Sequence, residues 1–463
     1  MNTIHNLTIE TRLDPRESGE LMAYFEQWRT EYGKIYRYAW YHYARLPKRP
    51  GKSVFNTELQ KRFGVTKRTA NSIIYETSGR YSALLELKKT EKTQLDGKVA
   101  ALEEQIMLLK KEINADAILA AENRLSAEEL AEYKNRKRSL YYKKQKLKRK
   151  KDLARQLDKD IREGNLKICF GGRKLFDAQN RLAENGFRSH RQWYKAFIAR
   201  RDSNILYLGS KDESACNQML QLRPQPDGKL SVQCRKDGKA VKEKTDRYVY
   251  GRCRFSYLED HLLAGLLDRQ NGITYRIHFE GKKIYLQAII TIQNTNAHST
   301  CMADGAIGLD FNNGFIQLAE TDREGNLVYL ERFPLFFHGT GGRAENEIRQ
   351  VVSQISRRSL QTGKSIVIED LDFKNRKSRC LKGRGKKSRY YNRIIHLLDY
   401  SRYKATMKNS AVRNHIDLII VNPAYTSAIA REKYCGQRKL NVHAGAAYVI
   451  ARRGQGFKEK FTA

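Results

Sequence analysis

The alternation of apolar and polar positions near the N-terminus predicts a strand followed by a long helix. The two kinds of residue alternate from Thr8 to Arg12, and apolar residues then recur at steps of three and four from Leu21 to Arg45. The helical stripe is mostly aromatic and contains Tyr24, Phe25, Trp28, Tyr32, Tyr36, Trp40 and Tyr43. Such a stripe either packs into a core or stacks on nucleic-acid bases.

Two short helical patterns meet at a glycine between Thr57 and Ile74. Gly64 separates them in the sequence TELQKRFGVTKRTANSII, and Lys67 and Arg68 open the second pattern. A helix-turn-helix would direct this second helix at a groove or a row of phosphates. An ordinary helical hairpin is the alternative. Lys67 and Arg68 are therefore candidate nucleic-acid contacts.

Residues 84–164 predict long, exposed helices. Leu, Lys, Glu and Ala dominate this stretch, proline is absent, and Gly97 is the one glycine before Gly164. One apolar seam runs through Leu95, Val99, Leu102, Ile106, Leu109 and Ile113. A single seam predicts a helix that packs on a partner helix.

The charge of this stretch changes towards its end. Between Arg136 and Arg155 there are eleven Lys or Arg and one acid, Asp152. A solvated helix face normally mixes both signs of charge, so this run favours phosphate binding, with two tyrosines available for stacking. The predicted nucleic-acid contacts are Arg136, Lys137, Arg138, Tyr141, Tyr142, Lys143, Lys144, Lys148 and Arg149.

Short alternating strands separated by turns follow in residues 165–300. We expect strands over Lys229–Gln233, Tyr248–Phe255, Thr274–Phe279 and Lys283–Ile292, with turns at Pro226-Asp227-Gly228, Lys236-Asp237-Gly238 and Glu280-Gly281. This spacing predicts a small antiparallel β-barrel, a fold past which nucleic-acid strands often thread.

Three strands and then alternating helices and strands are predicted from residue 301 onwards. The strands are Ala306–Asp310, Phe315–Glu320, Leu327–Arg332, Ser365–Ile368 and Asp417–Val421, and the helices are Ala344–Leu360, Arg389–Asn409 and Val442–Arg453. This order predicts an RNase H-like α/β domain, whose functional site lies at the strand ends. The fold class of the whole chain is therefore multidomain α+β.

Two acids occupy the strand ends at which such a domain carries its chemistry. Asp310 closes the first predicted strand and Glu369 the fourth, and these strands are neighbours in the RNase H-like order. Two Mg²⁺ ions that share carboxylate oxygens can hydrolyse a phosphodiester. A lone surface carboxylate is the alternative for either acid taken singly. Asp370 directly follows Glu369, so on a strand it faces the other way and is the less suitable ligand.

Composition points to a nucleic-acid partner. Lys and Arg number 88 against 51 Asp and Glu, a formal net charge of +37, and a surplus of this size favours binding to a phosphate backbone. No apolar run approaches the roughly 20 residues of a membrane-spanning helix, and no signal-peptide core is present. The seven cysteines lie at least 18 residues apart, which excludes a CxxC motif. We expect a soluble, intracellular protein.

Four C-terminal motifs resemble those of the transposon-encoded TnpB proteins, ancestors of the type V CRISPR effector nucleases. They are Ile307–Asp310, Ile366–Leu371, Val421–Ser427 and Ala446–Gly454, with weaker similarity over Ile168–Gln179 and Leu208–Gln218. The resemblance implies an RNA-guided DNA endonuclease of the prokaryotic cytoplasm, with a guide RNA, double-stranded target DNA and two Mg²⁺ ions, or Mn²⁺, as partners. Whether one copy or a homodimer binds the RNA stays open.

The resemblance also implies a division into domains. Residues 1–45 would join a wedge barrel at 165–300, residues 46–164 would form a helical recognition lobe, and residues 301–463 a RuvC-type nuclease domain. A basic lid is expected over 376–389, which includes the candidate contacts Lys382, Arg384, Lys386 and Lys387. A basic loop without a specific role is the alternative for this segment.

Two departures from the family pattern affect the function. The zinc ribbon looks degenerate, since residues 427–436 contain the single cysteine Cys435, and no structural zinc is predicted. His443 stands where the family carries its last catalytic aspartate. Imidazole can bind a metal ion or deprotonate water, so we expect Asp310, Glu369 and His443 to be both metal ligands and catalytic residues.

Two other functions share these features. A nuclease-inactive, RNA-guided DNA-binding protein, acting as a repressor or targeting module, would explain the loss of one carboxylate. A transposase that acts on transposon ends without RNA would share the acids, although it has less need for such basic helices.

Overall fold

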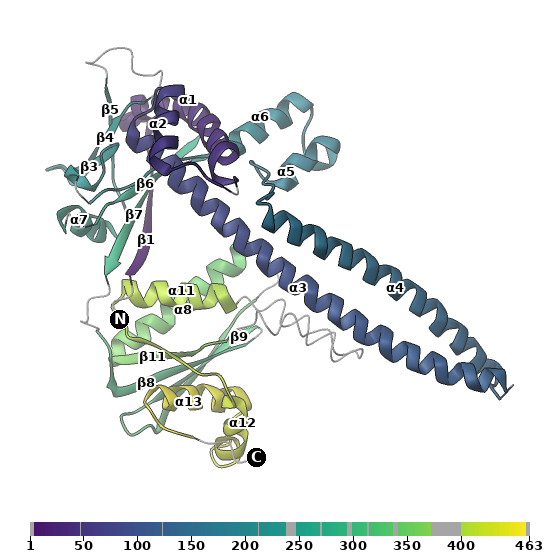
Figure 1. Cartoon of the computed structure of the whole chain (residues 1–463). Helices are drawn as coiled ribbons and strands as arrows, with labels where there is room; N and C mark the ends of the chain where they lie inside the picture. Colours follow the sequence, from purple (N-terminus) through teal and green to yellow (C-terminus); the bar gives the residue numbers. More distant parts are fainter. Residues whose placement is uncertain are drawn as a thin grey trace. The chain divides into compact units, whose positions relative to one another are not determined.

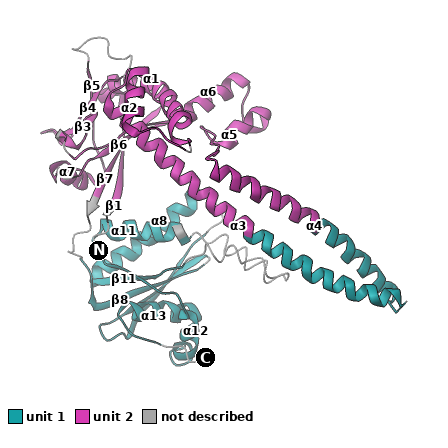
Figure 2. Cartoon of the chain, in the orientation of Figure 1, with its two compact units in different colours: residues 1–5, 97–143, 292–463 teal, residues 6–96, 144–291 magenta. Residues whose placement is uncertain are grey.

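The chain divides into two compact units in the computed structural model (Figure 2). Unit 1 contains residues 1–5, 97–143 and 292–463, and unit 2 contains residues 6–96 and 144–291. The structure describes residues 4–46, 48–122, 124–211, 213–237, 247–268, 271–293, 299–312, 314–336, 341–371 and 400–459. The expected division into four domains stays a prediction.

The aromatic stripe near the N-terminus is a core element. It lies on α1 (Pro15–Ala39) and on the π-helical turn Trp40–Ala44 that continues it, after strand β1 (Ile4–Arg12). All seven aromatic side chains of the stripe are buried, and Phe25 and Trp40 are completely inaccessible. The core-facing interpretation is thus confirmed, and these rings are not available to bases.

The predicted helical pair around Gly64 is present, but its second helix is far longer than expected. Helix α2 (Lys52–Phe63) ends at Gly64, whose φ of +67° reverses the chain, and α3 (Lys67–Ala121) then runs for 55 residues. Isolated glycines cost a helix only about 1 kcal/mol each, so Gly79 and Gly97 do not end it. The expectation of a short second helix was wrong for this reason.

Helix α4 (Ala127–Arg162) runs antiparallel to α3 and is the partner helix that the apolar seam predicts (Figure 1). Within unit 1, Lys143 Nζ donates to Gln105 Oε1 at 2.8 Å, and Arg136 pairs with Asp116. Gln105 and Asp116 follow one another along α3, whereas their partners Lys143 and Arg136 come in the reverse order along α4. Five of the six predicted seam residues are buried, and Val99 is half-buried.

Two separate antiparallel sheets stand where one barrel was expected. One sheet has the order β1-β7-β6-β2 and the other the order β3-β4-β5. Their strands after β1 are β2 (Asn204–Tyr207), β3 (Leu220–Pro224), β4 (Leu230–Arg235), β5 (Tyr248–Cys253), β6 (Thr274–Glu280) and β7 (Lys283–Gln293). The described strands close no barrel, because no strand pairing among the described residues joins the two sheets. The short helices α5 (Arg173–Asp177), α6 (His190–Arg201) and α7 (Glu259–Asp268) complete unit 2.

The C-terminal part of unit 1 has the predicted RNase H-like topology. Its sheet has the order β10-β9-β8-β11-β12, in which β8, β9 and β10 are antiparallel and β11 is parallel to both β8 and β12. The strands are β8 (Cys301–Asn312), β9 (Phe315–Thr321), β10 (Leu327–Pro334), β11 (Lys364–Glu369) and β12 (Leu418–Val421).

Helices cover both faces of this sheet (Figure 1). Side chains of α8 (Gly341–Thr362) and α11 (Tyr400–Arg413) join the larger apolar core on one face, and α13 (Val442–Gly454) packs on the other. The start of the predicted helix Arg389–Asn409 lies outside the described residues. Gly308 lets α13 approach closely, because a Cβ at this position would stand 2.1 Å from the carbonyl oxygen of Ala447.

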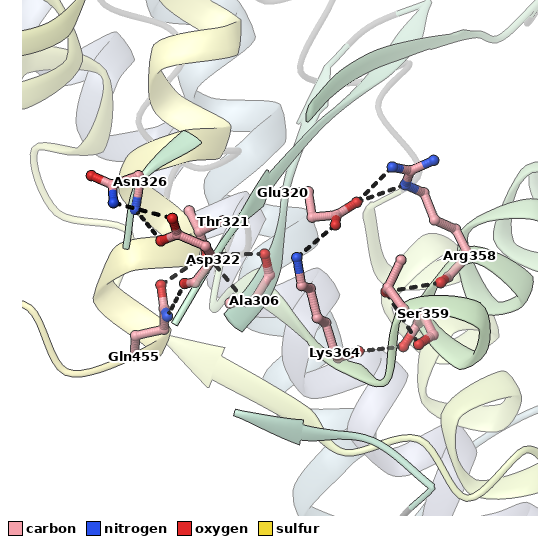
Figure 3. A network of polar contacts seen from close by, with 10 residues as sticks. Ala306, Glu320, Thr321, Asp322, Asn326, Arg358, Ser359, Lys364 and Gln455 are labelled. Carbon is pink, nitrogen blue, oxygen red and sulfur yellow. Dashed lines mark hydrogen bonds and ion pairs between the residues drawn. The ribbon is translucent and has the colours of Figure 1, made fainter. Parts of the chain in front are cut away.

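A buried ion network ties α8 to the sheet (Figure 3). Glu320 on β9 accepts from Arg358 of α8 at 2.8 Å and from Lys364 of β11 at 2.7 Å. The Glu320 side chain is only 6% exposed. Nearby, Thr321 Oγ1 donates to Gln455 Oε1, which links β9 to the end of α13.

Candidate active site

Asp310 and Glu369 lie beside one another on neighbouring parallel strands. Leu309 of β8 pairs in register with Ile368 of β11, and the two acids are the residues that follow this pair. Asp310 is 9% exposed and Glu369 is 7% exposed. The predicted proximity of these acids is therefore found, with β8 continuing two residues beyond Asp310 to Asn312.

The two acids also share one face of the sheet. Gly308 and Val367, two residues before them, contact α13, and alternate residues of a strand point the same way. Asp370 points to the opposite face, where its carboxylate pairs with Lys404 of α11. The strand thus presents Glu369 to the α13 face and directs Asp370 to the α11 face.

His443 reaches this face from the first turn of α13. Asn441 caps the helix, and its Oδ1 accepts from the backbone N–H groups of His443 and Ala444 at 3.0 and 2.8 Å. His443 Nδ1 lies 3.1 Å from Asp310 Oδ2. An ionised carboxylate can only accept, so Nδ1 is the donor of this hydrogen bond.

Polar neighbours hold both acids in place. Asn312 Nδ2 donates to Asp310 Oδ2 at 2.8 Å, and Thr426 Oγ1 donates to Glu369 Oε1 at 2.7 Å. The Tyr400 hydroxyl donates to the backbone carbonyl of Glu369. Burial raises the pKa of Tyr400, and the charges of Glu369 and Asp370 raise it further, so this hydroxyl stays protonated. No local sequence pattern identifies Thr426 or Tyr400 as partners of Glu369.

The His443 ring also packs on a neighbouring aromatic ring. Phe315 at the start of β9 meets it edge to face, with ring centroids 5.1 Å apart. The guanidinium of Arg332 lies 3.7 Å from the Phe315 centroid on the same ring. These contacts fix the imidazole plane, while its side chain remains 47% exposed. His443 is therefore oriented by protein and open to a substrate.

The donor set suits an oxygen-seeking cation. Asp310 Oδ1 accepts no hydrogen bond from the described residues, and a partly shielded carboxylate oxygen without a donor is a good ligand for Mg²⁺. No cluster of three or more His, Cys, Asp or Glu side chains able to hold a metal ion occurs among the described residues. The arrangement brings together two carboxylates, with His443 held against one of them.

The predicted contacts on α4 divide into engaged and open side chains. Arg136 pairs with Asp116 and Glu132, Lys143 bonds Gln105, and Lys137 lies 4.3 Å from the ring centroid of Tyr133. The remaining candidates are exposed to solvent, with Tyr141 and Tyr142 at 60% and 64%. They are Arg138, Tyr141, Tyr142, Lys144, Lys148 and Arg149.

Lys67 and Arg68 line a hollow at the start of α3. The hollow measures about 720 Å³, and Gln60, Asn71, Gln218 and Arg235 also line it. Arg68 is engaged by Glu213 and by Gln218, whose Oε1 accepts from Arg68 Nε at 3.1 Å. Lys67 is exposed. Of the two predicted contacts, Lys67 is thus the more open.

The two remaining predicted features are the basic lid and the degenerate zinc ribbon. Residues 376–389, including Lys382, Arg384, Lys386 and Lys387, lie outside the described residues. The segment expected to be a degenerate zinc ribbon forms helical turns, α12 (Thr426–Ile429) and a π-helical turn (Ala430–Cys435). Ile429 and Ala430 pack there against Val449 of α13. No described helix has both the length and the apolar character needed to cross a membrane.

Comparisons with known proteins give distant structural similarity alone. No family model and no curated protein sequence matches the chain. RuvC of T. thermophilus in complex with a Holliday junction substrate matches with a TM-score of 0.22 and 13% identity, over 32% of this chain and 88% of that chain. A CRISPR-Cas12f ternary complex matches with 0.23 and 11%, over 97% and 98%. A Cas12i–crRNA–dsDNA complex matches with 0.29 and 8%, over 80% and 60%.

Proposed function

We propose that this protein is an RNA-guided, metal-dependent DNA endonuclease. One observation carries the proposal: Asp310 and Glu369 leave neighbouring parallel strands on one face of an RNase H-like sheet, and His443 contacts Asp310 on that face. Carboxylates from separate strands that meet at one edge suit the hydrolysis of phosphodiesters. The guide RNA and the flanking DNA motif belong to this proposal through the family resemblance of the C-terminal motifs.

Asp310 and Glu369 would hold Mg²⁺, and Mn²⁺ is the alternative ion. Such ions supply a water activated for attack and stabilise the leaving oxygen. Asn312 and Thr426 each donate to one carboxylate, so both acids keep their orientation before a substrate arrives. His443 Nε2 can accept a proton from water or act as a further ligand, while Asp310 fixes the tautomer through Nδ1.

The basic helix α4 supports nucleic acid as the substrate and partner. Its exposed cations and the rings of Tyr141 and Tyr142 combine phosphate pairing with stacking. In an RNA-guided protein, base pairing supplies the sequence information and the protein reads heteroduplex shape. A protein of formal net charge +37 is suited to this work. The wedge, recognition-lobe and nuclease roles of residues 165–300, 46–164 and 301–463 are part of the proposal, and whether one or two copies bind the RNA stays open.

A nuclease-inactive, RNA-guided DNA-binding protein is the second candidate. The observation that favours it is the position of His443, whose Nδ1 bonds Asp310 where a third carboxylate would add charge for a metal ion. Mg²⁺ prefers oxygen ligands, so a site with two carboxylates binds it more weakly than a site with three. The third candidate is a transposase that acts without RNA, and such a protein would purify without RNA.

The test is cleavage by the purified ribonucleoprotein. The gene is expressed together with its flanking DNA, and the RNA that copurifies with the protein is sequenced. The complex is then incubated with a supercoiled plasmid that matches the guide. Linear or nicked DNA with Mg²⁺, and intact DNA with EDTA, is the expected result. The Asp310→Ala protein should bind the same plasmid without cutting it, which excludes a contaminating nuclease.

The other outcomes separate the candidates. Plasmid that is bound but stays supercoiled with Mg²⁺ and with Mn²⁺ would support the binding protein and reject the nuclease. A preparation that carries no RNA and cuts transposon ends would support the transposase.

A further inference from the structure

The sheet β3-β4-β5 of unit 2 has one buried face and one exposed face. Along β4 and β5 buried residues alternate with accessible ones, which is the pattern of an antiparallel sheet with one face on a core. The buried face of β5 packs on α1. A Cβ at Gly251 would stand 2.6 Å from Ser18 Oγ. The position of each side chain on the accessible face therefore follows from the strand register.

The accessible face forms three rows of cross-strand neighbours. Arg235 lies opposite Tyr248, Gln233 opposite Tyr250, and Ser231 opposite Arg252. Strand β3 extends two of these rows, with Gln221 beside Gln233 and Arg223 beside Ser231. The three strands contain no Asp or Glu at any position. The face thus presents tyrosine rings, arginines, amides and a hydroxyl.

The two tyrosine rings face solvent. Tyr250 is 59% exposed and Tyr248 is 40% exposed. They are two residues apart on one strand, which places their Cβ atoms about 7 Å from each other on the same face. Each ring can accept one base, because every base has a flat face that stacks on an aromatic ring. Because both rings face solvent, packing in the core does not account for tyrosine at these two positions.

Arginines border the tyrosines on both ends of the face. Arg235 has no ion-pair partner among the described residues, and Arg223 bonds the Gln221 amide at 2.9 Å without meeting an acid in the part of the chain that the structure describes. Arg252 pairs with Asp227 at 3.3 Å, in a contact where both side chains are more than two-fifths exposed. Exposed pairs of this kind contribute little and exchange readily for a phosphate.

We propose that this face, the β3-β4-β5 platform, binds an unpaired stretch of RNA. One base stacks on Tyr248 and one on Tyr250, and Arg223, Arg235 and Arg252 pair with the phosphates on either side. Gln233 lies beside Tyr250, and Ser231 lies between Arg223 and Arg252, where both can bond base edges and the 2′-hydroxyl that DNA lacks. The identification of the strand as RNA rests on the proposed function, in which the guide RNA stays bound.

The platform continues into a second polar surface. Arg235 also lines the hollow of about 720 Å³ at the start of α3, together with Lys67, Gln60 and Asn71. The acid in this lining, Glu213, is paired with Arg68. A strand that leaves the tyrosines past Arg235 would meet further amides and a lysine. An unpaired strand fits this course better than a duplex, whose bases are already stacked and paired.

The test measures binding of unpaired oligonucleotides to the full-length protein. Copurified nucleic acid is removed at high salt, and anisotropy titrations use a labelled ten-nucleotide RNA, the DNA of the same sequence and an RNA duplex, all in EDTA. The titrations are run at about 0.3 M KCl, because salt weakens purely ionic contacts on other basic surfaces. The variants are Tyr248→Ala with Tyr250→Ala, and as a matched control Tyr248→Phe with Tyr250→Phe.

The double alanine variant should raise the Kd for unpaired RNA by tenfold or more, since each stacked base contributes about 1–3 kcal/mol. The double phenylalanine variant keeps the rings and should stay within about twofold of the parent protein. DNA and duplex RNA should bind more weakly than the unpaired RNA. If the alanine variant unfolds, Arg235→Gln with Arg252→Gln should lower the salt dependence of binding by about 0.7 per arginine.

An unchanged Kd in a folded alanine variant would overturn the platform. Equal binding of DNA and RNA would overturn the choice of RNA, and tighter binding of duplex would overturn the choice of an unpaired strand. Failure of the proposed nuclease appears elsewhere, as intact plasmid with Mg²⁺. The EDTA titrations do not depend on cleavage, so the two failures are distinguishable.

Discussion

His443 Nδ1 lies 3.1 Å from Asp310 Oδ2, although 133 residues separate the two in the chain. The contact couples the N-terminus of α13 to the middle of the sheet. It leaves Nε2 without a hydrogen bond to the described residues. An imidazole held this way offers a nitrogen lone pair, which an aspartate at the same position lacks.

His443→Ala should lower the rate of plasmid cleavage by about 100- to 10,000-fold, which is the usual contribution of a positioned acid or base. Binding of the target should not change, because the role proposed for His443 is in the chemical step. The rate is measured in single-turnover reactions with Mg²⁺. His261→Ala on α7 is the matched control, and a loss of cleavage in both variants would contradict the assignment.

Glu369, the last residue of β11, and Asp370, which follows it, should respond differently to substitution. Glu369→Gln should reduce cleavage on the order of 1,000-fold, as removal of a central catalytic group does. Asp370→Asn removes an exposed pair with Lys404 and should leave cleavage within about twofold. Both are measured in the same plasmid assay. Equal effects of the two substitutions would show that the face of the sheet to which each side chain points does not decide function.

Gly308→Ala should destabilise the C-terminal sheet and the helices packed on it by about 2–3 kcal/mol through overpacking. The added Cβ would meet backbone atoms, the Ala447 oxygen at 2.1 Å and the Ala451 nitrogen at 2.4 Å, so α13 must move. Gly79→Ala in α3 is the control, because its Cβ meets nothing within 4 Å and should stabilise the helix by about 0.5–1 kcal/mol. Urea unfolding followed by circular dichroism measures both, and a neutral Gly308→Ala would refute the close packing of α13.

Glu320→Gln should destabilise the protein by about 3 kcal/mol. The substitution leaves Arg358 and Lys364 without their shared carboxylate in a largely buried setting (Figure 3). The control is Glu345→Gln on α8, which removes an exposed pair with Arg349 and should cost less than about 1 kcal/mol. The midpoint of urea unfolding gives the comparison. Similar midpoints for the two variants would mean that burial does not strengthen the Glu320 network.

Substitution of exposed Lys and Arg side chains on α4 should weaken the salt dependence of RNA binding. Replacing Lys144, Lys148 and Arg149 together with Gln should lower the slope of log Kd against log salt by about 2–3. Arg136→Gln should change the slope less, because Arg136 is already paired with Asp116 and Glu132. Titrations of the RNA between low and moderate salt measure the slope, and an unchanged slope in the triple variant would remove α4 from the binding surface.

The sequence predicts those parts of the structure that depend on local pattern. The hairpin of β6 and β7 follows from alternation on both sides of Glu280-Gly281, and Gly281 has the expected positive φ of +59°. The nearness of Asp310 and Glu369 follows from strand order. These features require no knowledge of distant contacts.

Features that depend on distant contacts were not predictable. The bond of Thr426 with Glu369 joins residues 57 positions apart, and neither residue carries a local signature of it. The family resemblance predicts that His443 and Asp310 share a site, but not that the imidazole bonds the carboxylate directly. The barrel was not found because alternation identifies strands without saying which sheets they join. Strand β2 is only four residues long, too short for a clear alternation.

The register of β11 decides more than the packing of the core. This strand pairs with β8 on one side and with β12 on the other. Its last residue, Glu369, and the next residue, Asp370, face opposite sides of the sheet. A slip by one residue would present Asp370 to α13 and turn Glu369 towards α11, with every hydrophobic residue exchanged as well. Folding to the correct pairing is thus the step that decides which of the two carboxylates lies beside Asp310 and His443.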